Sequence, residues 1–383
     1  MNDVLAGSVF ALTIAIFGAS SKRVFLEWKR RGFGLFDRKT HILGAVPLLA
    51  LPGFIASYVI VQKSPANQGP ASQVHSLYLI VIIISLVALF VIRGKRGGIL
   101  HTATTTALGA ALAARLFTSS VVGAMILIPE ILIGKTLISA IWSSLPFFFS
   151  AVGGFCLNDV CDRAQDSINK PYRAIPSGRL TSQTVLTISL SALATSACLT
   201  IVGNLTVLEK LLQTCVLVGI VLYNWVVRQA GVVKGVYTAL LATIPFVYVG
   251  ASAHRLDVTV GFAICVLFFM TGRELLMDSV DVSGDLSAGI ATLPTIIGAR
   301  SAQLLGFGCL YIGLAAMAWW ARYAHANHAP LFLGVAAALV VTATATWLLC
   351  SSSAIRRTIN TALWAPMLVG VSLFVAETAS HGQ

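Results

Sequence analysis

Residues 155–181 read FCLNDVCDRAQDSINKPYRAIPSGRLT, and residues 272–298 read GRELLMDSVDVSGDLSAGIATLPTIIG. Both stretches contain the spelling Asp-x-x-Asp-x-x-x-Asp, and each aspartate of the second copy lies 119 residues after its counterpart. Each copy closes a long apolar segment. The whole chain has only 14 acidic residues, so these six hold a large share of its negative charge. They are Asp159, Asp162, Asp166, Asp278, Asp281 and Asp285.

The spacing within each motif predicts that its three carboxylates share one face of a helix, because residues three, four and seven apart stack on a helix surface. Carboxylates beside apolar spans are costly and usually functional. Six of them require cations, and Mg²⁺ suits the pattern because it binds few carboxylates and completes its shell with water and phosphate oxygens.

The composition predicts an all-α, polytopic membrane protein. The chain is 57% hydrophobic and 10% charged, with a mean hydropathy of +0.87, whereas soluble domains carry about 25% charged residues. A spanning helix needs roughly 20 apolar residues, and these runs are too long for barrel strands. The approximate expected spans are 1–20, 41–62, 77–92, 116–134, 136–157, 183–204, 208–227, 235–253, 258–277, 301–321, 330–350 and 359–379.

The net charge of +12 is placed unevenly. Basic residues crowd alternate connections, whereas the connections between them hold few. The positive-inside rule makes the basic side cytoplasmic, and both aspartate motifs lie on it. We expect juxtamembrane basic residues to meet lipid and anionic substrate, and expect no nucleic-acid partner. The basic connections are 22–39, 93–115, 163–179, 228–234, 300 and 356–357.

Three regions are expected along the chain. Residues 1–98 supply three spans without chemistry, and their role is left open. Residues 99–115 are expected to form an interfacial helix or linker, and residues 116–383 supply nine spans and both motifs. The seven Cys show no metal-ligand spacing and are interpreted as apolar filler.

The two motifs resemble those of the UbiA superfamily of intramembrane prenyltransferases. The segment from Asn158 to Asp166 is similar to the family's first hallmark, and Asn169–Arg173 is similar to its Asn-Lys-Pro-x-Arg tail. The second motif, followed by Gly289 and by Thr292–Pro294, is similar to the second hallmark. Ala174 stands where the family often has proline. The resemblance implies a nine-helix UbiA-like core over 116–383. It does not cover residues 1–98, where the apolar runs predict about three extra transmembrane helices.

The resemblance also implies a catalytic site that binds Mg²⁺ and a prenyl diphosphate. The expected catalytic carboxylates are Asp159, Asp162, Asp278 and Asp281. The expected metal ligands are these four with Asn158, Asp166 and Asp285, the last two being more peripheral. The expected diphosphate-binding residues are Asn158, Arg115, Lys170, Arg173, Tyr223, Arg228 and Lys234. Whether Arg228 or Lys234 reaches the phosphate is left open at this point.

The predicted reaction is transfer of a prenyl group from its diphosphate to an aromatic or lipid-alcohol acceptor. The anionic head requires metal and cationic donors, and a helical bundle supplies an apolar tunnel for the tail. The alternative within the superfamily is a terpene cyclase, which ionises the same diphosphate without an external acceptor. A transporter with acidic ion sites also explains intramembrane carboxylates. It leaves the basic tail of the first motif unexplained.

Overall fold

The computed structural model describes residues 109–374 apart from 112, 325–328, 365, 368 and 372. The predicted three-helix module at 1–98 and most of the predicted interfacial segment 99–115 lie outside the described residues. Within the described part, every regular element is a helix, which confirms the all-α class.

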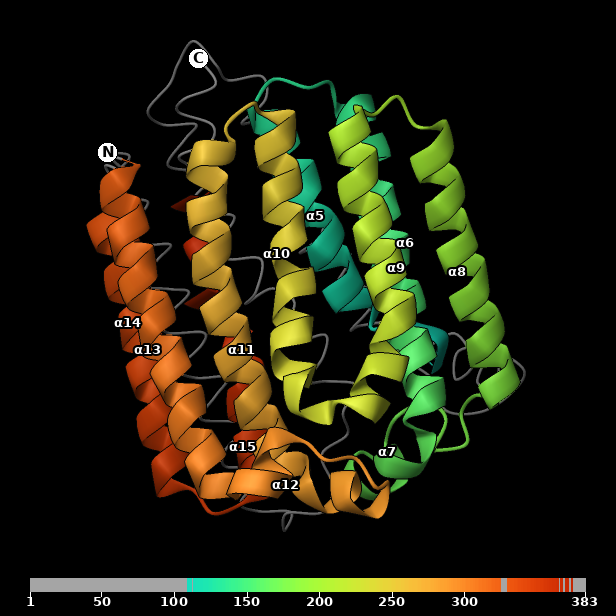
Figure 1. The fold of residues 1–383 in the computed structure, drawn as a ribbon, viewed down its shortest axis with the longest axis vertical. Coiled ribbons are helices and arrows are strands. Elements are labelled where there is room, and N and C mark those ends of the chain that lie inside the picture. The colour runs from blue at the N-terminus through green and yellow to red at the C-terminus, as the bar shows by residue number, and fades with distance from the viewer. Residues whose placement is uncertain are drawn as a thin grey trace, which may run out of the picture.

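Long helices run side by side between two ends of the molecule, as Figure 1 shows. They are α5 (Leu116–Leu132), α6 (Leu137–Cys161), α8 (Ser182–Val202), α9 (Val207–Gln229), α10 (Lys234–Ser252), α11 (Leu256–Ser287), α13 (Ala299–Tyr323) and α14 (Ala329–Leu349). The shorter elements are α7 (Arg163–Asn169), the 3₁₀ turn η2 (Gly231–Val233), α12 (Leu293–Ile297) and α15 (Ser353–Ala362). Among the described residues, seven helices are long and apolar enough to cross a membrane.

Threonine caps fix where several of the long helices begin. The hydroxyl of Thr181 accepts a hydrogen bond from the backbone N–H of Thr184 (3.2 Å) and so starts α8. At the start of α9, Thr206 and Glu209 form a reciprocal capping box with distances of 3.2 and 2.7 Å. Such caps satisfy backbone donors that have no partner inside the helix.

The core is built around α11, which packs against α10 and α13. Gly272 and Gly306 allow the close approach of α11 and α13, because a Cβ on Gly272 would lie 2.5 Å from the Gly306 carbonyl oxygen. Small residues at such crossings are typical of helices that associate in lipid. Toward the end where α11 begins, Phe262 packs on Phe246 and Trp320, with ring centroids 5.1 and 4.9 Å apart.

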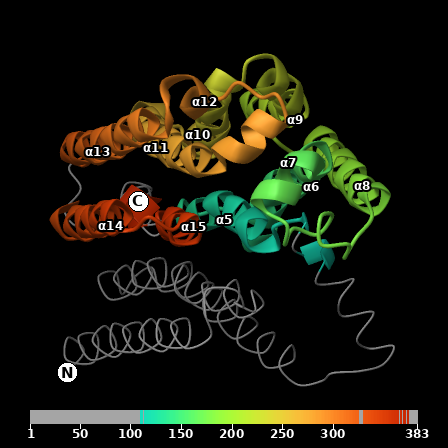
Figure 2. The same cartoon turned by 90° about the horizontal axis from the view of Figure 1, so that it is seen from below.

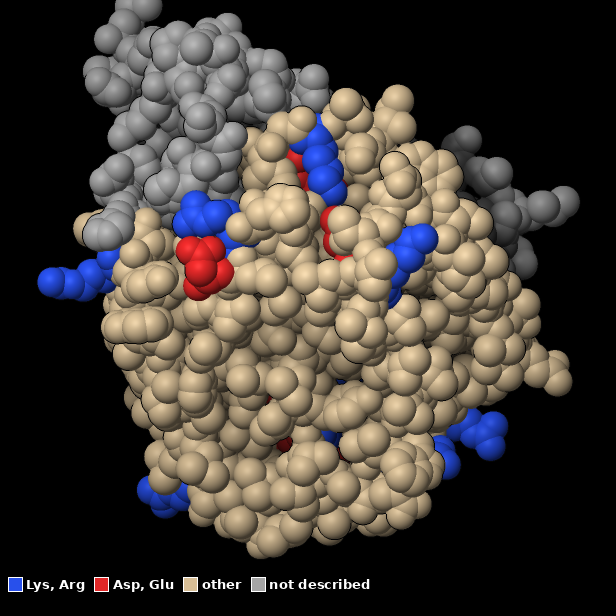
Figure 3. All heavy atoms as spheres, turned by 45° about the horizontal axis from the view of Figure 1, so that its top comes forward, with Lys and Arg blue, Asp and Glu red and all other residues tan. Residues whose placement is uncertain are grey.

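Charged side chains gather toward the two ends of the bundle. The flank visible in Figure 3 carries almost no Lys, Arg, Asp or Glu. An apolar flank of this kind suits contact with lipid, so the molecule is an integral membrane protein. In Figure 2, which views the bundle from one end, α7 and α12 lie across the end nearest the viewer.

Candidate active site

The end covered by α7 and α12 brings the two aspartate motifs together. Asp159 lies in the last turn of α6, and Asp278 lies in the last third of α11. The predicted single helix face is correct for the second motif, because α11 continues to Ser287. It is wrong for the first motif. There α6 ends at Cys161, Asp162 adopts φ −89° and ψ 10°, and Asp166 belongs to the separate helix α7.

The first motif is surrounded by arginines. Asp159 is 2% exposed, and its Oδ1 accepts a hydrogen bond from Arg115 at 3.2 Å and forms an ion pair with Arg173 at 2.9 Å. Arg173 also pairs with Asp166, which is buried. The guanidinium of Arg115 stacks 4.6 Å above the ring of Phe155. Arg115 itself has φ 40°, a left-handed backbone that non-glycine residues seldom adopt, and it is the residue that directly precedes α5. The two arginines that pair with Asp159 and Asp166 are therefore gathered at the end of α6.

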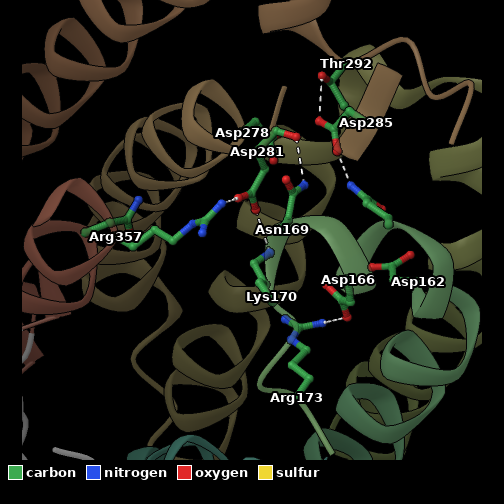
Figure 4. Close-up of polar contacts among 12 residues, drawn as sticks. Asp162, Asp166, Asn169, Lys170, Arg173, Asp278, Asp281, Asp285, Thr292 and Arg357 are labelled. Carbon is green, nitrogen blue, oxygen red and sulfur yellow. Dashed lines mark hydrogen bonds and ion pairs between the residues drawn. The ribbon is translucent and has the colours of Figure 1, made fainter. Parts of the chain in front are cut away.

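The second motif is paired with cations from three other segments. Lys234, at the start of α10, donates to Asp278 at 2.6 Å. Lys170, which follows α7, lies 2.6 Å from Asp281, and Arg357 of α15 donates to the other oxygen of Asp281 at 2.8 Å. Figure 4 shows Asp281 between these two cations. Buried carboxylates of this kind need such partners to remain charged.

Helix α7 docks directly on α11 and thereby joins the two motifs. The side chain of Gln165 donates to Asp285, and Asn169 donates to the backbone carbonyl of Asp281 at 2.8 Å. Thr292, just before α12, donates to the second oxygen of Asp285 at 3.0 Å. Gly284 allows this approach, because a Cβ at that position would collide with the side chain of Asn169.

Asp162 differs from the other five aspartates, since it is only partly buried. Its Oδ2 accepts from the amide of Asn158 at 2.8 Å, and no Lys or Arg of the described residues pairs with it. Tyr223 of α9 lies between the motifs, within electrostatic range of both Asp162 and Asp278. Asp162 is thus the most solvent-accessible of the six motif carboxylates.

The structure distinguishes the two basic residues that the sequence left open. Lys234 contacts the second motif through Asp278. Arg228 is exposed in the last turn of α9, within electrostatic range of Cys161, and in the described part of the chain it makes no ion pair with either motif. The remaining predicted site residues, Arg115, Lys170, Arg173 and Tyr223, lie beside the aspartates.

Burial shifts the ionisation of the groups outside the spanning helices. It raises the pKa of the Asp166 carboxyl above its ordinary value, although Arg173 and Lys170 oppose the shift. It lowers the pKa of the Lys170 amine, and Arg173 acts in the same direction, while Asp281 opposes both. Both shifts have the sign expected when desolvation disfavours the charged form.

Sequence reasoning missed Gln165 and Arg357. Gln165 lies inside the first motif at a variable position of the spelling, so only the docking of α7 on α11 reveals its contact with Asp285. Arg357 lies 76 residues after Asp281. In the sequence, Arg356 and Arg357 stand out only as part of the basic side. The signal that the sequence offered for Arg357 is that it lies directly before the last apolar span.

The donors of the site suit Mg²⁺ in their chemistry. Carboxylate oxygens and the amide of Asn158 are hard oxygen ligands, and half-buried Asp162 carries no competing cation among the described residues. In the described part of the chain, no three Asp, Glu, His or Cys residues already converge on one point. The five buried aspartates instead face Lys, Arg, Gln or Thr partners.

The sequence of this chain is similar to a known family and to individual proteins. The model of the UbiA prenyltransferase family matches residues 102–365. A digeranylgeranylglyceryl phosphate synthase of Methanococcus maripaludis is 29% identical over 44% of this chain and 59% of the relative. One of Thermococcus kodakarensis is 28% identical over 44% of this chain and 60% of the relative. The chain therefore spans less than two thirds of the length of these curated relatives.

Two solved structures share the fold. One, described as giving insights into digeranylgeranylglyceryl phosphate synthase in membranes, has a TM-score of 0.55 at 17% identity and covers 72% of this chain and 99% of its own. The other is a UbiA homologue of Aeropyrum pernix K1 without ligand, with a TM-score of 0.55 at 16% identity over 68% of this chain and 98% of its own.

Proposed function

Because this chain belongs to the UbiA prenyltransferase family, we propose that it transfers a prenyl group from a prenyl diphosphate to an acceptor within the membrane. The observation that carries the proposal is the meeting of two aspartate motifs and their cations at one end of an apolar helical bundle. An amphiphile with an anionic head and a hydrocarbon tail fits such a site, because its head meets charges and its tail meets apolar helices.

The diphosphate head is bound by the cations that now pair with the aspartates. Lys170, Arg173 and Lys234 come from different segments and surround the space between the motifs, with Arg115 beside the first motif and Arg357 beside the second. Lys and Arg both bind phosphate oxygens, and Arg does so in a two-pronged geometry. The hydroxyl of Tyr223 adds a neutral donor near Lys234.

Mg²⁺ would be held by Asn158, Asp159, Asp162, Asp278 and Asp281, with Asp166 and Asp285 more peripheral, and when bound it would neutralise charge on the diphosphate oxygens. Asp166 and Asp285 are already engaged by Arg173 and by Gln165 and Thr292, which fits their supporting part.

The chain's own residues favour breakage of the allylic C–O bond. Negative charge grows on the leaving diphosphate, and Lys170, Arg173 and Lys234 stabilise that growth more than they stabilise the bound reactant. The positive charge on the prenyl carbon is left on the side of the bundle interior, where buried apolar side chains exclude water.

The acceptor that we propose is a lipid alcohol. The relatives are named digeranylgeranylglyceryl phosphate synthases, and this name favours a glycerophosphate lipid over an aromatic acceptor. The proposed orientation places the α7 and α12 end in the cytoplasm, because Lys170, Arg173 and Lys234 lie there together with exposed Arg179 and Arg228.

Product analysis of the full-length protein in detergent tests the proposal. The protein is incubated with Mg²⁺ and radiolabelled geranyl, farnesyl or geranylgeranyl diphosphate, each with and without geranylgeranylglyceryl phosphate or an aromatic quinone precursor. EDTA and an Asp162→Asn variant are the controls. We expect an ether product that requires the lipid acceptor. A cyclic terpene formed without acceptor, or turnover that persists in both controls, contradicts the proposal.

A further inference from the structure

One partly buried carboxylate outside the two motifs lies beside them. Glu274 precedes Asp278 by four residues on α11, which places it one helical turn, about 6 Å, deeper in the bundle. Its side chain is 15% exposed. It faces the interior, since a Cβ on Gly235 of α10 would lie 3.5 Å from its Cβ. It also lies within electrostatic range of Tyr223 and Asp278.

No other acidic residue of the described part occupies such a position. Glu130 and Glu209 pair with Lys135 at the far end of the bundle, and Asp257 is exposed in the first turn of α11. The six motif aspartates lie at the end that receives the diphosphate head. Glu274 alone among the described carboxylates lies next to the motifs on the side toward the prenyl tail.

The neighbouring helix region holds Glu274 in place through Arg273. Arg273 donates to Oε1 of Glu274 at 2.8 Å, and its guanidinium stacks 4.6 Å above the ring of Trp364. Asn360 of α15 donates to the backbone carbonyl of Arg273 at 2.8 Å. The second oxygen, Oε2, has no hydrogen-bond partner among the described residues. Among the described residues, Glu274 therefore has one oxygen anchored by Arg273 and one oxygen without a partner.

The position matches the place where the two substrates must meet. The reacting prenyl carbon is attached to the diphosphate on its tail side, so the acceptor hydroxyl must approach just inside the ring of charges. From the geometry we infer that Glu274 is the catalytic residue that accepts the proton of the acceptor hydroxyl, with Arg273 as its positioning residue. This inference rests on the proposed prenyl transfer.

The step balances without any further reactant. The acceptor oxygen forms a bond to the prenyl carbon, the bond from that carbon to the diphosphate oxygen breaks, and its electron pair leaves with the diphosphate. The acceptor O–H proton passes to Oε2 of Glu274. The ion pair between Glu274 and Arg273 does not prevent this transfer, because the acceptor O–H group becomes strongly acidic as its oxygen bonds to the prenyl carbon.

Substitution of Glu274 separates this role from a structural one. Glu274→Gln keeps the volume and removes the proton acceptor, whereas Glu274→Asp keeps the carboxylate and shortens the side chain. We expect kcat for ether formation to fall about 10²- to 10⁴-fold in Glu274→Gln, the range of general base catalysis, with KM for the prenyl diphosphate unchanged. We expect Glu274→Asp to retain more activity than Glu274→Gln. Equal activity of Glu274→Gln and wild type, or the opposite order of the two variants, overturns the inference.

If Glu274→Gln does not fold, a second variant still tests the inference. Glu274→Ala leaves space beside Gly235, so added formate can supply the missing carboxylate. A kcat that returns with formate supports the inference, and a kcat that formate leaves unchanged overturns it. Asp257→Asn, an exposed carboxamide substitution on the same helix, serves as matched control and is expected to retain wild-type kcat. If the wild-type protein forms no ether product, the proposed function itself is wrong. If the wild-type protein forms ether and the Glu274 variants do not behave as expected, only the role given to Glu274 is wrong.

Discussion

The guanidinium of Arg357 lies 2.8 Å from Oδ1 of Asp281, across 76 residues of sequence. Lys170, from the segment that follows the first motif, lies 2.6 Å from the other oxygen of the same carboxylate. Asp281 is therefore the point where α11, α15 and the tail of the first motif meet. Figure 4 shows this junction.

Removal of the Arg357 charge tests that junction. Hydrogen bonds to charged groups contribute about 1.5–3 kcal/mol, so Arg357→Gln is expected to weaken prenyl diphosphate binding about 10- to 150-fold while Lys170 keeps Asp281 paired. The measurement is KM in the ether-forming assay. Arg300→Gln, which removes an exposed arginine at the start of α13, is the control and is expected to leave KM unchanged. Equal KM values in the two variants contradict the assignment.

The docking of α7 on α11 depends on the missing side chain of Gly284. Gly284→Ala introduces a methyl group that collides with the side chain of Asn169, so α7 must move away from α11. We expect turnover to fall at least tenfold, because the two motifs no longer share their geometry. Gly334→Ala on α14 is the matched control, since a Cβ there meets nothing within 4 Å. Wild-type turnover in Gly284→Ala argues against a requirement for the docking.

The aspartates themselves are tested by near-isosteric substitutions. Asp162→Asn and Asp278→Asn each remove the charge of a proposed metal ligand with almost no change of volume, so they are expected to abolish turnover and leave membrane insertion intact. Turnover is measured in the ether-forming assay, and insertion is measured by membrane fractionation and size-exclusion chromatography. Asp257→Asn controls for the loss of a carboxylate elsewhere on α11. Near-normal turnover in either motif variant shows that the metal assignment is wrong.

The ionisation of Lys170 predicts an alkaline limit for substrate binding. Burial lowers the pKa of the Lys170 amine below the ordinary 10.5. Because a lysine is charged only below its pKa, Lys170 loses its charge at a lower pH than an exposed lysine. Affinity for prenyl diphosphate should therefore fall with rising pH before 10.5 is reached. Lys170→Arg should keep the charge and extend the plateau to higher pH, as measured by KM against pH.

The proposed orientation in the membrane predicts opposite labelling of two exposed loops. Asn204 lies between α8 and α9 at one end, and Arg179 precedes α8 at the other. In intact cells, a membrane-impermeant maleimide should label Asn204→Cys above the wild-type background and should label Arg179→Cys only after permeabilisation. The reverse pattern would place both aspartate motifs outside the cytoplasm.

The sequence alone determined the fold class and predicted the chemistry of the site. Uniform apolar runs of about 20 residues leave helices as the available spanning structure, and two spaced aspartate triplets at the ends of such runs indicate a site for cations and an anionic ligand. The described helices α8, α9 and α13 lie within two residues of the predicted spans 183–204, 208–227 and 301–321. These features depend on local composition and spacing, which a sequence carries directly.

Only the tertiary structure decided which partners complete the site. Because α6 ends at Cys161, Asp166 belongs to α7, and the packing of α7 on α11 brings Gln165 to Asp285. Lys234, and not Arg228, contacts Asp278 because of how separate helices pack, and the contact between Arg357 and Asp281 has the same origin. Such contacts join residues far apart in sequence. They depend on helix ends, on missing side chains such as that of Gly284, and on the directions of long side chains, none of which residue spacing encodes.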